Sequence, residues 1–226
     1  MILAGGLATR LGRLSQKTPK ALLPVAGEPF IFHQLRLLRR YGVENIVVCA
    51  GYLGEQIQAR VGEGRQFGLS VRYSFDWPDL LGTGGAVRRA LPLLGETFMV
   101  MYGDSYLDLD YQSVFQAFRD SGKPALMTVY RNDDQYDSSN VVFKAGSIKL
   151  YDKKTKSPDM KFIDYGLGCL TSGVVAEWPL DKFDLAEIYT SLSRRGELAG
   201  YEVSNRFYEI GSYEGLSELD ELLRGQ

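Results

Sequence analysis

The sequence predicts an α/β protein built on a mixed, mostly parallel sheet with helices on both faces. Stretches typical of strands alternate with stretches of helical periodicity, which is the pattern of parallel strands joined by right-handed crossovers. Residues 45–50 (NIVVCA) and 98–102 (FMVMY) are continuous apolar runs, as expected of strands covered on both faces. The chain has 226 residues, enough for one sizeable domain or two small ones, and we expect a single domain over residues 1–226.

The predicted elements follow this alternation in order. Residues 29–41 carry Phe32, Leu35, Leu38 and Tyr41 at helical spacing, and the glycine that follows ends the helix. The strand at 45–50 comes next. Further helices are predicted at 54–61, 82–94, 111–121, 184–195 and 213–223, and further strands at 71–75, 98–102, 125–130 and 197–202. Alternating residues on either side of Ala145–Gly146 predict a hairpin of 140–143 with 147–151.

The composition argues against several classes of function. A net charge of −2 provides no basic field for nucleic acid, and no run of about 18 apolar residues suggests a membrane span. No positively charged leader is visible. Cys49 and Cys169 lie in apolar runs and are expected to be buried thiols in a reducing compartment. We therefore expect a cytoplasmic protein, monomeric or dimeric by default. Its one histidine, His33, is expected to pack on a helix rather than to bind metal.

The stretch from Leu3 to Pro24 is the best candidate for binding an anionic ligand. A short apolar run leads into Gly5–Gly6, and glycines after a strand let backbone N–H groups approach an anion. Arg10 and Lys20 add two cations of different shape, a planar fork and a point charge. These features suit a triphosphate, although the stretch matches neither a Walker loop nor the dinucleotide fingerprint. Because so few residues precede Gly5, either the first strand is short or the natural chain begins earlier.

The same stretch resembles the nucleotide-binding loop of the sugar-1-phosphate nucleotidyltransferases, roughly L-A-G-G-x-G-T-R-L…P-K-x-L-x-P-V. The matching residues are Leu3, Ala4, Gly5, Gly6, Thr9, Arg10, Leu11, Pro19, Lys20, Leu22, Pro24 and Val25; Ala8 departs from the pattern. The resemblance implies a Rossmann-like nucleotide-diphospho-sugar transferase fold, with residues 1–125 mainly binding nucleotide and 126–226 mainly binding sugar. It implies that Arg10 and Lys20 are catalytic cations. It also implies that the nucleotide contacts Leu3, Ala4, Gly5, Gly6 and Thr9.

Two carboxylates are candidates for binding Mg²⁺. Asp104 directly follows a buried strand, and carboxyl ends of strands in open α/β sheets face the ligand crevice. Carboxylate and phosphate oxygens are the ligands that Mg²⁺ prefers. In the resembling family this aspartate holds the catalytic metal. The second ligand lies in a W-x-D-x-G-T segment, which residues 207–212 resemble with Glu209 in place of the aspartate. Asp108 and Asp110 are expected to be helix-cap or surface groups.

The resemblance also implies where the nucleobase would lie. Residues 81–86 resemble the family's L-G-T-x-G segment, so Gly82 and Thr83 are candidates for base contact; the alternative is a plain helix entry. Asp76 is the nearest candidate for the residue that reads the base edge, and the alternative is a solvated loop residue. An ionised carboxylate only accepts hydrogen bonds, and guanine offers two adjacent donors where uracil offers one. Asp76 therefore favours GTP slightly over UTP.

A second group of candidates would hold the sugar phosphate. The charged run 152–156 is usually just a solvated surface, but the family keeps a lysine in a comparable segment. Lys153 and Lys154 both fit, and Lys153 is preferred. Residues 162–170 resemble the segment that lines the sugar pocket, so Asp164 and Gly166 are candidates for contact with sugar hydroxyls. Core packing explains the apolar members of that segment equally well.

The resemblance implies a reaction in which a nucleoside triphosphate and a sugar 1-phosphate give a nucleotide sugar and pyrophosphate. The short chain is closest to the heptose-1-phosphate guanylyltransferase and muramate-1-phosphate uridylyltransferase branch. We favour GTP and a heptose 1-phosphate. The alternatives are a UTP-dependent or other NTP-dependent transferase, including one acting on phosphocholine, and an inactive regulatory member of the same fold. Retention of Arg10, Lys20 and Asp104 together favours the enzyme.

Overall fold

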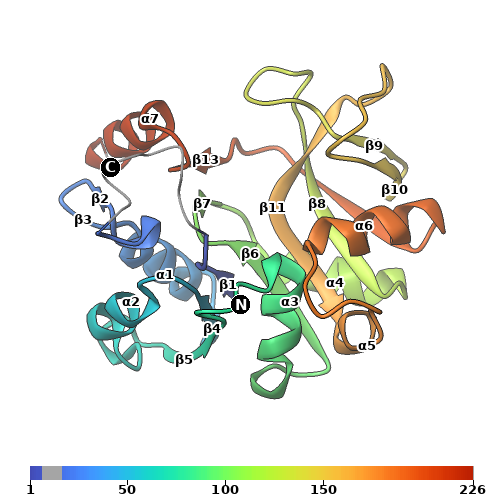
Figure 1. Cartoon of the computed structure of the whole chain (residues 1–226). Coiled ribbons are helices and arrows are strands. Elements are labelled where there is room, and N and C mark those ends of the chain that lie inside the picture. Colours follow the sequence, from blue (N-terminus) through green and yellow to red (C-terminus); the bar gives the residue numbers. More distant parts are fainter. Residues whose placement is uncertain (7–16, 226) are drawn as a thin grey trace. The chain divides into compact units, whose positions relative to one another are not determined.

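The computed structural model describes residues 1–6 and 17–225, which form two compact units (Figure 1). The first unit comprises Met1–Leu80, Met101–Asp108 and Phe207–Gln226, and the second comprises Leu81–Val100 and Leu109–Arg206. The expected single domain, and its division near residue 125, stay predictions. We describe each unit by itself.

The first unit is built on parallel strands in the order β5-β4-β1-β6. These strands are β1 (Ile2–Leu3), β4 (Asn45–Ala50), β5 (Ser70–Phe75) and the end of β6 (Thr97–Tyr102). Ile2 pairs with Val48 on one side and with Met101 on the other, so β1 lies between β4 and β6. Two helices connect the strands, α1 (Phe30–Arg40) and α2 (Gly54–Val61), as expected of right-handed crossovers.

The first unit also contains an apolar cluster. It joins α1 to the C-terminal helix α7 (Tyr213–Arg224) and to the short hairpin of β2 (Pro24–Val25) and β3 (Glu28–Pro29). Its buried members are Val25, Phe30, Leu37, Tyr106, Ile210 and Leu219. A second short ladder pairs β7 (Ser105–Tyr106) with β13 (Tyr208–Glu209). The Nε2 atom of His33 lies 2.8 Å from the carbonyl oxygen of Val25, which confirms its expected packing role.

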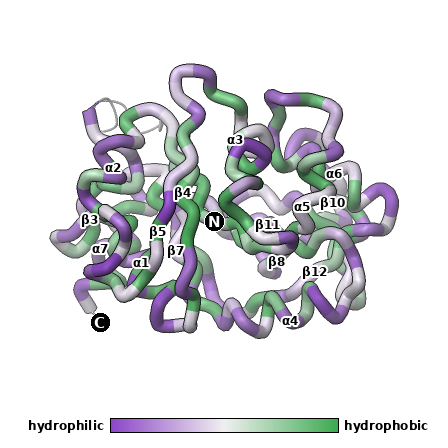
Figure 2. Tube along the Cα trace, turned by 90° about the horizontal axis from the view of Figure 1, so that it is seen from below, coloured by the Kyte–Doolittle hydropathy of each residue, from purple (hydrophilic) through white to green (hydrophobic). Residues whose placement is uncertain are grey.

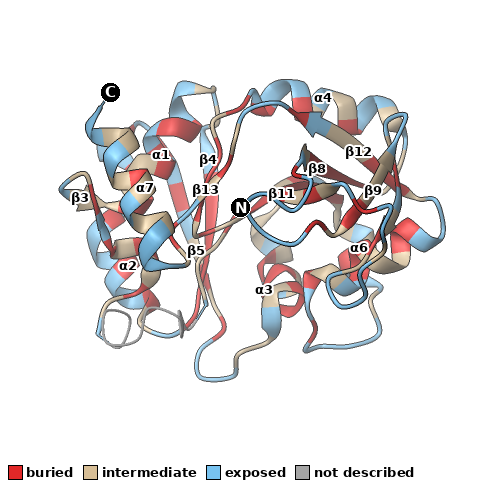
Figure 3. Ribbon diagram, turned by 90° about the horizontal axis from the view of Figure 1, so that it is seen from above, coloured by how far each residue is buried: buried red, intermediate tan, exposed pale blue. Residues whose placement is uncertain are grey.

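The second unit contains strands in the order β11-β8-β12-β10-β9. They are β8 (Ala125–Arg131), β9 (Val141–Lys144), β10 (Ser147–Tyr151), β11 (Phe162–Thr171) and β12 (Leu198–Val203). β12 runs parallel to β8, whereas β11 runs antiparallel to it, and β9 and β10 form the predicted hairpin. Buried residues continue along most of β11, as along β4 in the first unit (Figure 3).

The helices of the second unit are α3 (Gly82–Ala90), α4 (Tyr111–Ser121), α5 (Ser172–Ala176) and α6 (Leu185–Arg194). Hydrophobic and hydrophilic positions alternate along α4, which is typical of a helix with one buried face (Figure 2). Asp110 caps α4 by accepting hydrogen bonds from the N–H groups of Gln112 and Ser113, as predicted.

The predicted fold class is confirmed, since the chain combines parallel and antiparallel strands with helices. The helix expected at 82–94 ends at Ala90 and continues as a 3₁₀ turn over Leu91–Leu93, because Pro92 cannot donate to the helical ladder. The expected buried thiols are confirmed: burial raises the pKa of Cys49 and of Cys169 to about 12, and both are free. Within residues 1–6 and 17–225, no helix has the length and apolar character needed to cross a bilayer.

Candidate active site

Glycines follow three neighbouring parallel strands of the first unit, at the carboxyl end of each. Gly5 follows β1 with one residue between, and Gly51 and Gly103 directly follow β4 and β6. A Cβ atom on Gly103 would lie 2.6 Å from the carbonyl oxygen of Leu3, and one on Gly51 would lie 2.7 Å from that of Gly5. Side chains are therefore excluded at these two positions. Main chain without side chains forms this edge, which is where open α/β sheets bind ligands. Gly6 differs, because a Cβ atom there would meet nothing within 4 Å.

Asp76 lies beside these glycines. It follows β5 and is only 7% exposed, so the alternative of a solvated loop residue is wrong. Its Oδ1 atom lies 3.1 Å from where a Cβ atom of Gly51 would stand and 3.6 Å from the same point on Gly5. The first unit thus places an acceptor group next to the glycine of the predicted nucleotide loop. The need for Gly51 was missed in the sequence, because it arises from the neighbouring strand.

An ion pair in this site joins Lys20 to Asp104. The Lys20 Nζ atom donates to Asp104 Oδ2 at 2.8 Å, and the two side chains are 20% and 30% exposed. Lys20 opens a 3₁₀ turn (Lys20–Leu22) after Pro19, and Asp104 follows the glycine at the end of β6. Partial burial reduces screening by water, so this ammonium and carboxylate orient each other more strongly than a surface pair would. The structure therefore brings two predicted residues, far apart in sequence, into contact.

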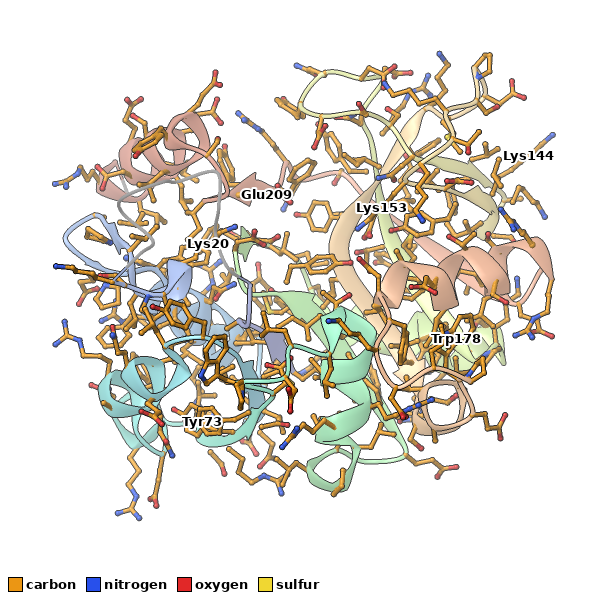
Figure 4. All side chains as sticks on the ribbon, in the orientation of Figure 1. Lys20, Tyr73, Lys144, Lys153, Trp178 and Glu209 are labelled. Atoms are coloured by element: carbon orange, nitrogen blue, oxygen red, sulfur yellow. The ribbon has the colours of Figure 1, made fainter. Side chains whose placement is uncertain are left out.

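Glu209 lies close to the backbone of Asp104. Glu209 pairs with Ser105 in the β13–β7 ladder, and the N–H of Ile210 donates to the carbonyl oxygen of Asp104 at 2.9 Å. A Cβ atom on Gly211 would lie 3.8 Å from Lys20 Nζ and 3.9 Å from Asp104 Oδ2, so the 209–211 segment borders the charge pair. The Glu209 side chain is exposed; it is labelled with Lys20 in Figure 4.

These residues fit Mg²⁺ by their chemistry. Asp104 and Glu209 offer only carboxylate oxygens, the hard ligands that this ion selects. No group of three or more metal-ligating side chains occurs in the described part of the chain. Two carboxylates would therefore leave most coordination positions to phosphate and water oxygens, which is usual for Mg²⁺ bound with a nucleotide.

The rest of the predicted nucleotide loop is only partly described. Thr9 and Arg10 lie outside the described residues. The Ala4 N–H donates to the carbonyl oxygen of Cys49 at 2.7 Å, and the Gly103 N–H donates to that of Leu3 at 2.9 Å. The backbone of Leu3 and Ala4 is therefore fixed by the sheet up to the point where Gly5 begins.

In the second unit, the G-T-G-G turn at the start of α3 packs against residues 181–185. The Thr83 hydroxyl donates to Asp184 Oδ1 at 2.9 Å and accepts from the Leu185 N–H at 2.8 Å. Gly82 has φ +75°, and a Cβ atom there would lie 2.5 Å from the carbonyl oxygen of Phe183. These contacts explain the glycine and the threonine as packing residues. Base contact by Gly82 and Thr83 stays a prediction.

The predicted sugar-phosphate residues lie at a bulge in β11. Asp164 pairs with Val129 and Gly168 with Met127, so four steps along β11 match two steps along β8. Gly166 occupies the bulge with φ +100°, a conformation that favours glycine. The Gly166 N–H donates to Asp164 Oδ1 at 3.1 Å, which holds the carboxylate against the bulge. Bulges often redirect side chains next to functional sites.

Asp164 is surrounded by polar groups of the same unit. Burial raises the pKa of its carboxyl group, and the Lys153 ammonium, the Gly166 N–H and the Tyr151 hydroxyl oppose that rise. The Tyr151 hydroxyl donates to Asp164 Oδ2 at 3.3 Å. By contrast, Lys154 contacts Asp152 through its backbone N–H. The Lys153 charge and the Gly166 N–H therefore both act on Asp164, and the structure adds Tyr151, which the sequence indicated only as part of a hairpin strand.

Comparison with known proteins shows the family of this chain. Residues 1–213 match the nucleotidyl transferase family, and the chain belongs to that family. The N-acetylmuramate alpha-1-phosphate uridylyltransferase of Neisseria meningitidis is 41% identical over 117 residues, 51% of each chain. The D-glycero-alpha-D-manno-heptose 1-phosphate guanylyltransferase of Campylobacter jejuni is 26% identical over 213 residues, 93% of each chain.

A solved structure shares the fold. It is a putative glucose-1-phosphate thymidylyltransferase from Bacillus anthracis, with a TM-score of 0.88 and 23% identity, and the match covers 100% of this chain and 94% of that one. The matched region covers 51%, 34% and 60% of three of the curated relatives. The present chain thus spans about half the length of these proteins.

Proposed function

We propose that this protein is a sugar-1-phosphate nucleotidyltransferase, which converts a nucleoside triphosphate and a sugar 1-phosphate to a nucleotide sugar and pyrophosphate. The observation that carries the proposal is the Lys20–Asp104 pair at the glycine-lined carboxyl edge of the parallel strands. The names of the relatives from Neisseria and Campylobacter support the same reaction.

The chemistry needs positioning and charge stabilisation more than proton transfer. A phosphate oxygen of the sugar 1-phosphate attacks the α-phosphorus, and pyrophosphate leaves with the electrons of the broken P–O bond. The nucleophile is already an anion, so no general base is required. The barrier comes from bringing two anions together and from charge on the departing oxygens. Lys20, together with Arg10, would neutralise the β- and γ-phosphates.

Asp104 and Glu209 would hold Mg²⁺, which supplies charge neutralisation on the reacting phosphate oxygens when bound. The Lys20 ammonium already compensates the Asp104 carboxylate at 2.8 Å. With both ligands bound, Lys20 would pair with the triphosphate and Asp104 with the cation, so each side chain would keep a partner of opposite sign. The pair thus keeps both charges in place without leaving either one uncompensated.

The other residues would define the two substrates. Leu3, Ala4, Gly5, Gly6 and Thr9 would line the nucleotide, with Asp76, Gly82 and Thr83 near its base. Lys153, Asp164 and Gly166 would bind the sugar phosphate and sugar hydroxyls. The effect of the Lys153 charge on the pKa of Asp164 supports Lys153 over Lys154 for this role.

For the nucleotide and sugar, we favour GTP and a heptose 1-phosphate. The burial of Asp76 next to Gly5 supports a role in reading the two donors on the guanine edge. The extent of the match to the Campylobacter guanylyltransferase supports the same choice. The higher identity to the Neisseria uridylyltransferase favours the second candidate, UTP with a muramate-type sugar.

The test is release of pyrophosphate by the full chain with Mg²⁺, GTP, UTP, CTP or dTTP, and a panel of sugar 1-phosphates that includes heptose and N-acetylmuramate. A thermal-shift series with the same nucleotides ranks their binding. We expect release that requires both substrates, fastest with GTP. If a nucleotide binds but no sugar 1-phosphate supports release, the chain is an inactive, regulatory member of the fold.

A further inference from the structure

Helix α1 directs one buried amide to the turn that carries Asp104. Gln34 is only 1% exposed, on a helix whose other buried residues are apolar. Its Nε2 atom donates to the carbonyl oxygen of Ser105 at 2.8 Å and to that of Tyr102 at 3.3 Å. These two carbonyls lie on either side of Gly103–Asp104. A single side chain therefore bridges both ends of the turn.

The same turn is held by main-chain contacts from neighbouring strands. The Gly103 N–H donates to the carbonyl oxygen of Leu3, and the Asp104 carbonyl accepts from the Ile210 N–H, both at 2.9 Å. With the Gln34 amide, the backbone around Asp104 is tied to β1, to the β13 segment and to α1. This fixes the direction in which the Asp104 carboxylate leaves the chain, toward Lys20.

Hydrogen bonding at Gln34 is incomplete, which argues that the residue is not there for stability. Gln34 Oε1 and Ser105 Oγ lie in residues that are 1% and 0% exposed, and neither atom has a hydrogen-bond partner among the described residues. A buried polar atom without a partner is unfavourable, and an apolar side chain of similar size would avoid it. What the glutamine adds is the pair of hydrogen bonds to the turn.

We infer that Gln34 is a positioning residue for Asp104. It holds the 102–105 turn so that the carboxylate stays on the Lys20 ammonium and in place for the metal and the phosphates. The effect on turnover rests on the proposed function; the effect on the turn does not. Contacts that orient a metal-binding residue in this way are worth about 10–100-fold in activity or metal affinity.

The test compares Gln34→Met, which keeps the shape and removes both donors, with Leu35→Met. Leu35 is the next residue of the same helix and is fully buried, so this control introduces the same side chain without removing a hydrogen bond to the turn. Hydrogen–deuterium exchange is measured on the metal-free, ligand-free full chain. We expect exchange about tenfold faster for the peptide over residues 101–107 in Gln34→Met, because two hydrogen bonds to the turn are lost, and wild-type exchange there in Leu35→Met.

The second readout is steady-state pyrophosphate release. We expect kcat to fall about 10–100-fold in Gln34→Met while KM for the nucleotide stays near the wild-type value, because orientation rather than binding is lost. If Gln34→Met does not fold, Gln34→Asn replaces it, since this amide is one methylene too short to reach both carbonyls. Unchanged exchange at 101–107, or equal kcat in Gln34→Met and Leu35→Met, overturns the inference. An inactive wild-type chain would instead contradict the proposed function, and the exchange result would still decide the role of Gln34.

Discussion

The two units hold their polar candidates by different means. In the first unit, Lys20 and Asp104 form a direct ion pair at the ends of parallel strands, and glycine is needed because neighbouring main chain approaches closely. In the second, Asp164 lies in a bulge of an antiparallel pair, where glycine is needed at residue 166 for its positive φ. The first arrangement excludes side chains from the strand edge that we propose binds phosphate, and the second fixes the orientation of one carboxylate.

This contrast assigns different kinetic roles to the two groups. A preformed ion pair can stabilise charge that develops during reaction, so its loss should lower kcat. Lys153 suits recognition of a phosphate, and Asp164, which accepts hydrogen bonds from neutral groups, suits recognition of hydroxyl groups. Loss of either residue should therefore raise KM. The predictions below test this division, from the largest expected effect to the smallest.

Asp104→Ala should reduce pyrophosphate release by about 10²–10³-fold, because a charged contact at the reacting phosphates is removed. Far-ultraviolet circular dichroism should show an intact fold. Asp108→Ala is the matched control, since this nearby carboxylate is bound to Arg40 at the surface. Equal turnover in the two variants would defeat the metal and charge assignment for Asp104.

Lys153→Ala should raise KM for the sugar 1-phosphate about 10–100-fold, the loss expected for a hydrogen bond to a charged group. The control is Lys154→Ala, whose backbone contact with Asp152 survives the change. Initial rates at saturating nucleotide measure both variants. A larger increase in Lys154→Ala would transfer the phosphate contact to that residue.

Gly51→Ala should destabilise the protein by about 1–3 kcal/mol, because the added methyl group overpacks the strand ends. The new Cβ atom would lie 2.7 Å from the carbonyl oxygen of Gly5. Gly6→Ala, where nothing lies within 4 Å, should change the free energy of unfolding by less than about 0.5 kcal/mol. Urea denaturation compares them, and equal effects would show that the strand ends can move apart.

Thr83→Val should lower stability by about 1 kcal/mol through the lost contacts with Asp184 and Leu185. Nucleotide affinity, measured by calorimetry, distinguishes the two explanations of this turn. If Thr83 only packs, the variant binds the nucleotide with unchanged affinity. If Thr83 contacts the base, the variant binds more weakly. The result shows whether the second unit takes part in nucleotide binding through this residue.

Long periodic or continuous apolar segments were predictable from the sequence. Helices α1 and α4 and strand β4 lie within a residue of the expected bounds, because their patterns extend over six residues or more. The two-residue strands β2, β3, β7 and β13 were not predictable, since they carry no periodicity and form only when tertiary partners arrive.

The candidate site was predictable only as far as motifs and strand ends allow. The position of Asp104 after a buried strand indicated a ligand-facing carboxylate, and the structure adds its ion pair with Lys20. Gln34 was not predictable, because a glutamine in a helix is buried only through tertiary packing. Lys153 and Lys154 are adjacent in sequence, and which of them lies beside Asp164 depends on the backbone path after β10.

The most direct measurement follows labelled phosphorus through a single reaction. The full chain is incubated with Mg²⁺, a sugar 1-phosphate and a nucleoside triphosphate labelled at either the α- or the γ-phosphate, and the products are separated. We predict that the α-label appears in the nucleotide sugar and the γ-label in pyrophosphate. A γ-label found in orthophosphate or on the sugar would contradict attack at the α-phosphorus and, with it, the proposed reaction.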